Sequence, residues 1–312
     1  MGDVTGIQWT DHTFNPWMGC QRVSPGCERC YAETLVTTRL RLPVWGPPKT
    51  TERKRTAVAN WRKPLAWDRA AAKAGKRARV FCASLADVFE DHPAVAPWRT
   101  ELFALIEQTP HLDWQLLTKR PENLRKMLPT AWLESPRPNV WLGTTVEDQR
   151  RADERIPRLL AVPASVHFLS CEPLLEHLSL GAHIGYCCDV HDAIGRGRCT
   201  YEVDWVIVGG ESGAGARPFD LEWSRSIVRD CRDAGVPVFV KQMGVNPIET
   251  ASRCPATGDT DGSSGCGLDE CASGCRYSRS VTRDVSLRDS HGGDPSEWPE
   301  DLRVRQMPEV RA

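Results

Sequence analysis

The sequence of 312 residues has almost no net charge and contains no long apolar run. Its 40 basic and 41 acidic side chains leave a formal charge of −1, so no overall field attracts nucleic acid or an anionic membrane surface. No apolar run approaches the roughly 20 residues of a membrane-spanning helix. The polar start Met1–Asp11 lacks the layout of a signal peptide. We therefore expect a cytoplasmic protein with no membrane partner, in which any nucleic-acid contact depends on a local patch.

Cysteine, in contrast, is abundant. The chain has 13 cysteines, and reducing compartments keep thiols from pairing as disulfides. Metal ligation is therefore the economical explanation. The odd number also fits a three-cysteine site plus unpaired structural cysteines better than a closed disulfide framework.

Short apolar runs alternate with segments of helical periodicity, which is typical of a parallel sheet with crossover helices. One strand is expected before Cys20, and six more at Arg79–Ser84, Trp114–Thr118, Val140–Thr144, Val166–Cys171, Trp205–Gly209 and Val236–Lys241. Helices are expected at Pro97–Gln108, Glu122–Leu128, Glu147–Leu160 and Leu221–Ala234. This order predicts an α/β fold with a complete or partial (β/α) barrel, although an open doubly wound sheet would give the same pattern.

Two polar, cysteine-bearing segments interrupt this order. His183–Val203 reads as an insertion between two strands, and Pro247–Asp294 has a composition that tends toward disorder unless a metal folds it. The predicted division is therefore a barrel at residues 1–246 and a Cys-rich C-terminal segment at residues 247–312. The basic run Lys49–Lys63 reads first as a solvated face and second as a phosphate-contacting patch.

Cys20, Cys27 and Cys30 lie within eleven residues, on a turn that contains Pro25 and Gly26. Three cysteines leave one iron of a 4Fe–4S cluster without a protein ligand, and a small chelating molecule can bind there. S-adenosylmethionine offers an amine and a carboxylate for this purpose. The alternative is a zinc knuckle whose fourth ligand is His12 or a distant cysteine.

Several segments resemble a phage-associated three-cysteine-motif family that is catalogued as a domain of unknown function. They are Ile7–Thr10, Asn15–Trp17, Gly19–Cys20, Ser24–Cys27, Cys30–Ala32, Leu116–Pro121, Trp141–Glu147, Ser170–Leu174, Val208–Gly213, Val240–Gln242, Gly292–Asp294 and Glu297–Pro299. That family is similar to radical S-adenosylmethionine enzymes and, more distantly, to spore photoproduct lyase. One departure is the spacing C-x6-C-x2-C, where the usual radical-enzyme loop is C-x3-C-x2-C.

The resemblance implies a radical S-adenosylmethionine enzyme on a barrel of the TIM type. It implies a 4Fe–4S cluster on the three cysteines, bound S-adenosylmethionine, and an external electron donor. The 5'-deoxyadenosyl radical formed from these would abstract hydrogen from an unidentified substrate, and the likeness to a DNA-repair lyase suggests a nucleobase, nucleotide or nucleic acid. The C-terminal segment would end in the family's tail.

Polar side chains follow nearly every predicted strand, where active-site groups of a β/α barrel lie. For any one of them, a helix cap or a surface role is an equal alternative. We predict catalytic roles for Lys119, Glu172 and Lys241. We predict cofactor contacts for Tyr31, Ser84, Arg120, Thr144, Gly209, Gly210, Glu211 and Ser212.

A second cysteine set predicts another metal site. Cys254, Cys266, Cys271 and Cys275 are spaced C-x11-C-x4-C-x3-C, and four thiols could hold zinc or an auxiliary 4Fe–4S cluster. Cys187, Cys188 and Cys199 could contribute to either. Cys82, Cys171 and Cys231 lie in apolar surroundings and are predicted to be buried packing residues.

The same sequence features are compatible with two other functions. One is a non-catalytic, zinc-binding phage protein that contacts DNA or a protein partner. The other is an S-adenosylmethionine-dependent barrel enzyme that transfers a methyl group by polar chemistry, with cysteines that are only structural.

Overall fold

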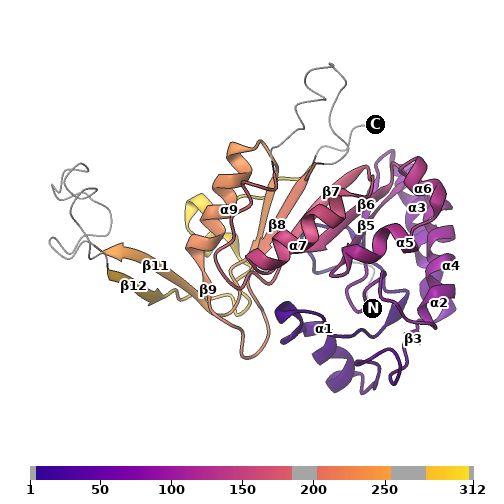
Figure 1. Cartoon of the computed structure of the whole chain (residues 1–312), viewed down its shortest axis with the longest axis horizontal. Coiled ribbons are helices and arrows are strands. Elements are labelled where there is room, and N and C mark those ends of the chain that lie inside the picture. Colours follow the sequence, from indigo (N-terminus) through magenta and orange to yellow (C-terminus); the bar gives the residue numbers. More distant parts are fainter. Residues whose placement is uncertain (1–4, 185–201, 254–278, 309–312) are drawn as a thin grey trace, which may run out of the picture.

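A computed structural model describes residues 5–184, 202–253 and 279–308 as a mixed α/β fold (Figure 1). The predictions for Cys187, Cys188 and Cys199, and for the four cysteines spaced C-x11-C-x4-C-x3-C, concern positions outside the described residues. Within the described part, no helix is both long enough and apolar enough to cross a membrane.

The central feature is a seven-stranded sheet in which every neighbouring pair of described strands is parallel. Its strand order is β1-β4-β5-β6-β7-β8-β10, which follows the chain. In a doubly wound sheet the order of the strands reverses at a switch point. The strand order observed here has no such reversal, so the sheet winds in one direction, as in a barrel. The edge strands β1 and β10 are not paired with each other, so the described sheet is a partial (β/α) barrel. The strands are β1 His12–Thr13, β4 Ala78–Cys82, β5 Leu112–Thr118, β6 Val140–Thr145, β7 Val166–Cys171, β8 Trp205–Gly209 and β10 Val238–Gln242.

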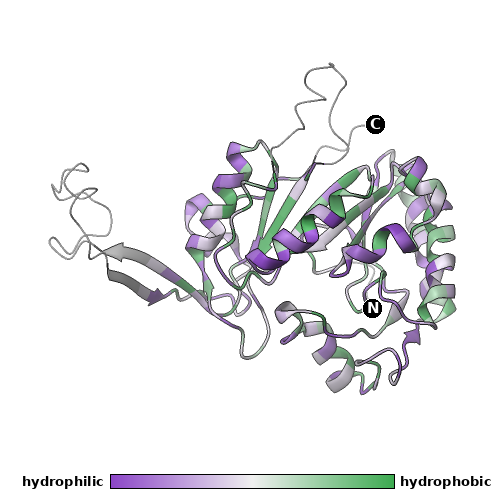
Figure 2. Ribbon diagram, in the orientation of Figure 1, coloured by the Kyte–Doolittle hydropathy of each residue, from purple (hydrophilic) through white to green (hydrophobic). Residues whose placement is uncertain are grey.

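Successive strand residues face two different cores, because side chains alternate along a strand. Trp114 and Leu116 of β5 point to the helix side, where they join the main hydrophobic cluster. Residues on the opposite face form a mainly aromatic cluster within the curve of the sheet. Its buried members are Trp9, Phe81, Trp141, Val166, Phe168, Trp205, Ile207 and Phe239. Figure 2 shows the strands of the central sheet as largely hydrophobic, consistent with their burial on both faces.

Four longer helices supply the helix-side core: α3 Lys63–Ala74, α4 Val95–Glu107, α7 Gln149–Leu160 and α9 Leu221–Asp233. The first turn of α7 is capped by Asp148, which accepts a hydrogen bond from Arg151 N at 2.7 Å. Asp220 caps α9 in the same way by accepting from Glu222 N. These caps place both helices directly after the strand-end loops that carry polar residues.

The remaining elements are short. They are β2 Trp17–Met18, β3 Lys54–Arg55, β9 Phe219–Asp220, β11 Pro247–Arg253, β12 Arg279–Asp284, α1 Tyr31–Thr34, α2 Val58–Trp61, α5 Leu124–Met127 and α6 Thr130–Glu134, with 3₁₀ helices at Pro25–Cys27, Pro121–Asn123, Pro295–Glu297 and Glu300–Leu302 and a π-helical turn at Leu35–Arg39. The pair β11–β12 projects away from the sheet (Figure 1).

All six predicted strands after Cys20 are confirmed, with each end within two residues of its predicted position, and the structure also has the expected strand before Cys20. The predicted helix at Glu122–Leu128 is shorter, a 3₁₀ turn followed by α5. Helix α3 and the hairpin β11–β12 were not predicted, because α3 is only weakly amphipathic and β11 lies within a polar segment. The chain after β12 returns to the main body, where Trp298 and Leu302 are buried in the main hydrophobic cluster.

Candidate active site

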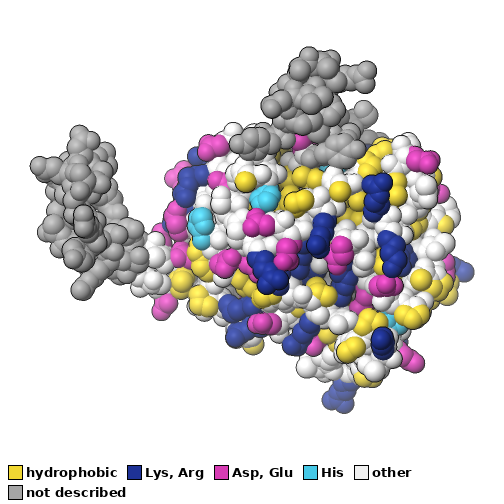
Figure 3. All heavy atoms as spheres, viewed as in Figure 1, with side chains coloured by type: hydrophobic (Ala, Val, Ile, Leu, Met, Phe, Trp, Pro, Cys, Tyr) yellow, Lys and Arg dark blue, Asp and Glu magenta, His cyan; other side chains and the backbone are white. Residues whose placement is uncertain are grey.

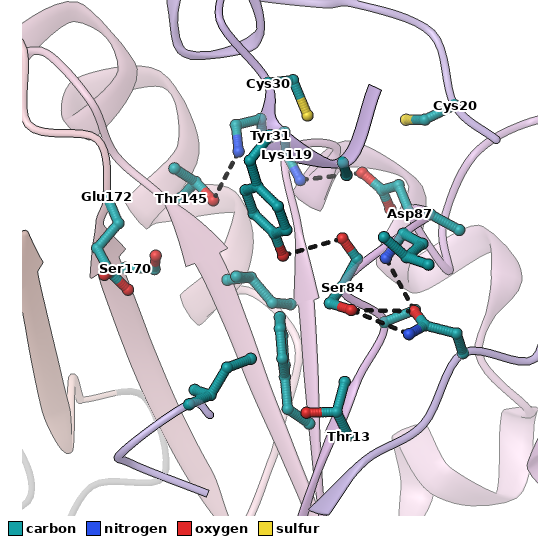
Figure 4. A pocket seen from close by; sticks show the side chains of 18 of the residues that line it. Thr13, Cys20, Cys30, Tyr31, Ser84, Asp87, Lys119, Thr145, Ser170 and Glu172 are labelled. Atoms are coloured by element: carbon teal, nitrogen blue, oxygen red, sulfur yellow. Dashed lines mark hydrogen bonds between the residues drawn. The ribbon is translucent and has the colours of Figure 1, made fainter. Parts of the chain in front are cut away.

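A cavity of about 610 Å³ lies where the carboxyl ends of the sheet strands meet the segment around the first three cysteines. Its walls include residues at or just after the carboxyl ends of β4, β5, β6, β7 and β10, together with α1. This is the edge at which β/α barrels carry their active sites. Figure 4 shows Cys20 and Cys30 at one end of the cavity and Thr13 at the other, with Tyr31 between them.

Cys20, Cys27 and Cys30 all line this cavity. The 3₁₀ turn Pro25–Cys27 and the start of α1 directly after Cys30 fold the loop back on itself, so residues ten apart in sequence come to one side. In Figure 4 the sulfur atoms of Cys20 and Cys30 point into the space between them. Burial raises the pKa of Cys20 to about 12, although Arg120 opposes the shift, and burial also raises the pKa of Cys30.

The other described cysteines do not reach this cavity. Cys82, Cys171 and Cys231 are buried in the helix-side core, as predicted. Among the residues that line the cavity, the three thiols are accompanied by no fourth cysteine and no histidine. His12 stacks on Trp67, with ring centroids 4.3 Å apart.

Among the described residues, no group of three or more His, Cys, Asp or Glu side chains is already arranged to hold a metal ion. Because burial raises the pKa of Cys20, binding of a metal ion to this residue would displace a proton from its thiol.

The loop is attached to the barrel at several points. Gly19 precedes the first cysteine with a φ of +111°, and a Cβ there would lie 2.3 Å from the Val44 carbonyl oxygen, so the position requires glycine. Gly26 N donates to Glu147 Oε1 at 3.3 Å. Arg217 Nη1 donates to the Pro25 carbonyl oxygen at 3.0 Å.

All three predicted catalytic residues line the cavity. Lys241 Nζ lies 2.9 Å from Glu172 Oε1, so these two side chains form an ion pair across the ends of β10 and β7. Lys119 Nζ donates to Thr145 Oγ1 at 3.3 Å. The sheet thus brings charged groups from three strand ends to one cavity.

The predicted cofactor contacts divide into two groups. Tyr31, Ser84, Arg120 and Ser212 line the cavity, and the Tyr31 hydroxyl donates to the Ser84 carbonyl oxygen at 3.1 Å. Tyr31 as a whole residue is 56% exposed, so it is accessible to a ligand.

The second group lies behind the cavity wall. Thr144 is buried and donates to the Thr118 carbonyl oxygen at 2.9 Å. A Cβ on Gly209 would meet Glu172 Oε1 at 2.9 Å, and one on Gly210 would meet the Met243 carbonyl oxygen at 2.6 Å. Glu211 receives hydrogen bonds from Arg217, so its carboxylate supports the cysteine loop through that arginine.

Comparison with known proteins identifies the family of this chain. Residues 4–280 match the family described as protein of unknown function (DUF5131). The chain belongs to this family. No curated protein matches it. The matched range of the DUF5131 chain contains every residue that lines the cavity, from Thr5 to Lys241.

Sequence reasoning missed one feature of the DUF5131 site, a buried cluster of two arginines and two carboxylates. Arg53 Nε lies 2.7 Å from Glu90 Oε2, and Arg120 Nη1 lies 2.8 Å from Asp87 Oδ2. Arg53 belongs to the basic run Lys49–Lys63, for which the sequence predicts a solvated face or a phosphate-contacting patch. This prediction is wrong for Arg53, because its side chain is fully buried. The available signal was Glu90, a charged residue at the end of the apolar run Val88–Phe89.

The charge of Asp87 is stabilised within this cluster. Burial opposes its ionisation, but Arg120 and hydrogen bonds from Thr118 Oγ1, Phe89 N and Lys119 N together hold the pKa of Asp87 below its usual range. Asp87 is therefore ionised at neutral pH and balances the charge of Arg120 at the wall of the cavity.

Proposed function

We propose that this DUF5131 protein is a radical S-adenosylmethionine enzyme with a 4Fe–4S cluster on Cys20, Cys27 and Cys30. The observation that carries the proposal is the set of three thiols on one cavity at the carboxyl edge of a sequentially wound parallel sheet. The described cavity wall contributes three thiols, the number that leaves one iron of a 4Fe–4S cluster open to a small chelating ligand.

The cofactors would supply electron transfer and, from reductive cleavage of S-adenosylmethionine, a 5'-deoxyadenosyl radical. The protein's own residues bind, orient and shield. The Tyr31 ring presents a flat face in the middle of the cavity, suited to packing against adenine. Lys119 offers an ammonium to a carboxylate, and the Lys241–Glu172 pair offers a donor and an acceptor to a polar substrate. The electron donor would be external.

For the substrate we propose a nucleobase, carried by a nucleotide or a nucleic acid. The support is the resemblance to a family distantly similar to spore photoproduct lyase, which is an argument from analogy. On the face shown in Figure 3, basic and acidic side chains are interspersed. A nucleic-acid substrate would therefore be recognised by local contacts rather than by an overall positive field.

Anaerobic purification and reconstitution test the cluster. The expected protein is brown, absorbs near 400 nm, holds about four irons on the first trio, and releases 5'-deoxyadenosine from S-adenosylmethionine after reduction. Cys27→Ala should abolish this cleavage. Cys231→Ala is the matched control, because it removes a buried thiol that does not line the cavity and should leave cleavage intact.

The rival functions give different products. A colourless protein that holds stoichiometric zinc and no iron after reconstitution would favour the zinc-binding partner protein and contradict the proposal. S-adenosylhomocysteine in place of 5'-deoxyadenosine would indicate polar methyl transfer. Cleavage retained in Cys27→Ala would show that the trio is not the cluster site.

The second cysteine set, Cys254, Cys266, Cys271 and Cys275, is proposed to hold zinc or an auxiliary 4Fe–4S cluster. Iron and zinc are therefore to be counted in the single variant Cys27→Ala as well as in the unaltered chain. Iron that persists in Cys27→Ala without cleavage activity would belong to this second set.

A further inference from the structure

The buried cluster of Arg53, Glu90, Asp87 and Arg120, called here the support tetrad, contacts the cysteine loop from behind. The side chains of Arg53 and Glu90 are 0% and 1% exposed, and those of Arg120 and Asp87 are each 8% exposed. Arg120 Nη2 also lies 3.7 Å from Glu90 Oε1, so the two ion pairs form one network. Two positive and two negative charges balance, which allows all four to be buried.

Arg120 reaches Cys20 directly. Its Nη1 lies 3.6 Å from Cys20 Sγ, within hydrogen-bond distance for sulfur, and its Nη2 donates to the Gln21 carbonyl oxygen at 2.8 Å. The same Nη1 donates to Asp87 Oδ2 at 2.8 Å. One planar guanidinium therefore joins a sulfur, a backbone carbonyl and a carboxylate, which the point charge of a lysine is not shaped to do.

Arg53 reaches Cys20 through the neighbouring loop. Its Nη1 donates to the Val44 carbonyl oxygen at 3.1 Å and its Nη2 to the Gly46 carbonyl oxygen at 2.8 Å. Gly46 N in turn donates to the Cys20 carbonyl oxygen at 3.0 Å. The residue that carries the first thiol is thus fixed at its sulfur and at its carbonyl by the two arginines of the tetrad.

Stability alone does not account for such a cluster. Well-packed apolar residues in place of a buried ion-pair network are often neutral or stabilising, because the charges lose their hydration on burial. A positional role provides the missing reason. Hydrogen-bond donors on the sulfur ligands of a metal centre orient the ligands and change the reduction potential of the centre.

We infer that the support tetrad positions Cys20 as a ligand, and that Arg120 tunes the bound cluster through its hydrogen bond to the Cys20 sulfur. The cluster part of this inference rests on the proposed function; the positioning part concerns the metal-free chain as well. Arg120, predicted from the sequence to contact the cofactor, acts as a positioning residue. Its guanidinium is engaged by the loop and by Asp87.

The test compares Arg120→Met and Arg120→Lys with Arg22→Met. Arg22 is the matched control, because it lies in the same loop and lines the same cavity, but its ion pair with Glu33 is exposed. In the metal-free chain, hydrogen–deuterium exchange of residues 18–24 should be faster in Arg120→Met than in the unaltered chain. It should be unchanged in Arg22→Met.

After anaerobic reconstitution, Arg120→Met should bind iron at the first trio about 10-fold more weakly or worse, the usual range for loss of a ligand's hydrogen-bond partner. Any cluster that forms should have a more negative midpoint potential and an altered EPR spectrum, because a positive donor is lost from its sulfur. Arg120→Lys keeps the charge and should recover the potential in part.

Unchanged exchange, iron content and potential in Arg120→Met would overturn the inference and leave the proposed function standing. Failure of the unaltered chain to take up iron would instead overturn the proposed function, while the exchange experiment would still decide whether Arg120 positions Cys20. If Arg120→Met does not fold, Arg120→Lys carries the same comparison, and an unchanged exchange rate and potential in that variant would count against the inference.

Discussion

Glu147 provides a sharp test of how the cysteine loop is attached to the barrel. Its side chain is fully buried between β6 and α7, where Oε2 accepts from Arg155 Nη1 at 2.7 Å and Oε1 accepts from Gly26 N at 3.3 Å. We predict that Glu147→Ala strongly destabilises the protein and loosens the turn before Cys27. The reason is that the substitution leaves a buried guanidinium without its carboxylate.

The magnitude follows from burial. Removal of one partner of a buried ion pair typically costs about 3–5 kcal/mol, which is a large part of the roughly 5–15 kcal/mol that stabilises an ordinary protein. With a urea dependence of about 3 kcal/mol per molar, the midpoint of unfolding should fall by about 1 M or more. Hydrogen–deuterium exchange of residues 24–28 should become faster in the same variant.

Glu154→Ala is the control on the neighbouring helix. Glu154 pairs with Arg150 at 2.8 Å, but both side chains are exposed, and ion pairs of this kind contribute little. We expect no measurable change in its urea midpoint. The double variant Glu147→Ala with Arg155→Ala should be less destabilised than the sum of the two single variants, because no unpaired charge remains. Equal stability of Glu147→Ala and Glu154→Ala would refute the reasoning.

Two further predictions concern the sheet. A Cβ on Gly143 would lie 2.4 Å from the Phe168 ring, so Gly143→Ala should lower the free energy of unfolding by about 1–3 kcal/mol or more. Adding Phe168→Leu to the same chain should restore part of this stability. If thermal unfolding shows no such recovery, the strain lies elsewhere. Burial lowers the pKa of His167 in the folded chain, so the unfolded chain takes up the proton first, and stability should fall as the pH drops below about 6.5. The unfolding free energy of His167→Gln should decline less between pH 7 and about pH 5, and an identical decline in both proteins would contradict this.

Much of the local structure could be read from the sequence. Runs such as Trp205–Gly209 are apolar on both faces, and this property, together with their short length, favours a buried parallel strand. Pro25 and Gly26 likewise predict a turn in the cysteine loop, because both residue types favour turns wherever they occur. The burial of Cys82, Cys171 and Cys231 was predicted on the same basis and is confirmed.

The site required more than local pattern. Strand-end position predicted Lys119, Glu172 and Lys241 together, and all three line the cavity. The same rule placed Thr144 and Glu211 there as well, but strand-end position does not report which way a side chain turns. Thr144 turns into the sheet, and Glu211 turns to Arg217.

Local sequence was enough to predict the strands of the central sheet, their chain order and the three neighbouring thiols, because each depends on residues within a few positions of one another. The folded structure was needed to show that the sheet winds sequentially, that Arg53 is buried, and that Arg120 contacts Cys20. The partners in these contacts are 37 residues apart for Arg53 and Glu90 and 100 residues apart for Arg120 and Cys20. No local periodicity carries that information, since the pairing of buried charges is set by where the folded strands end.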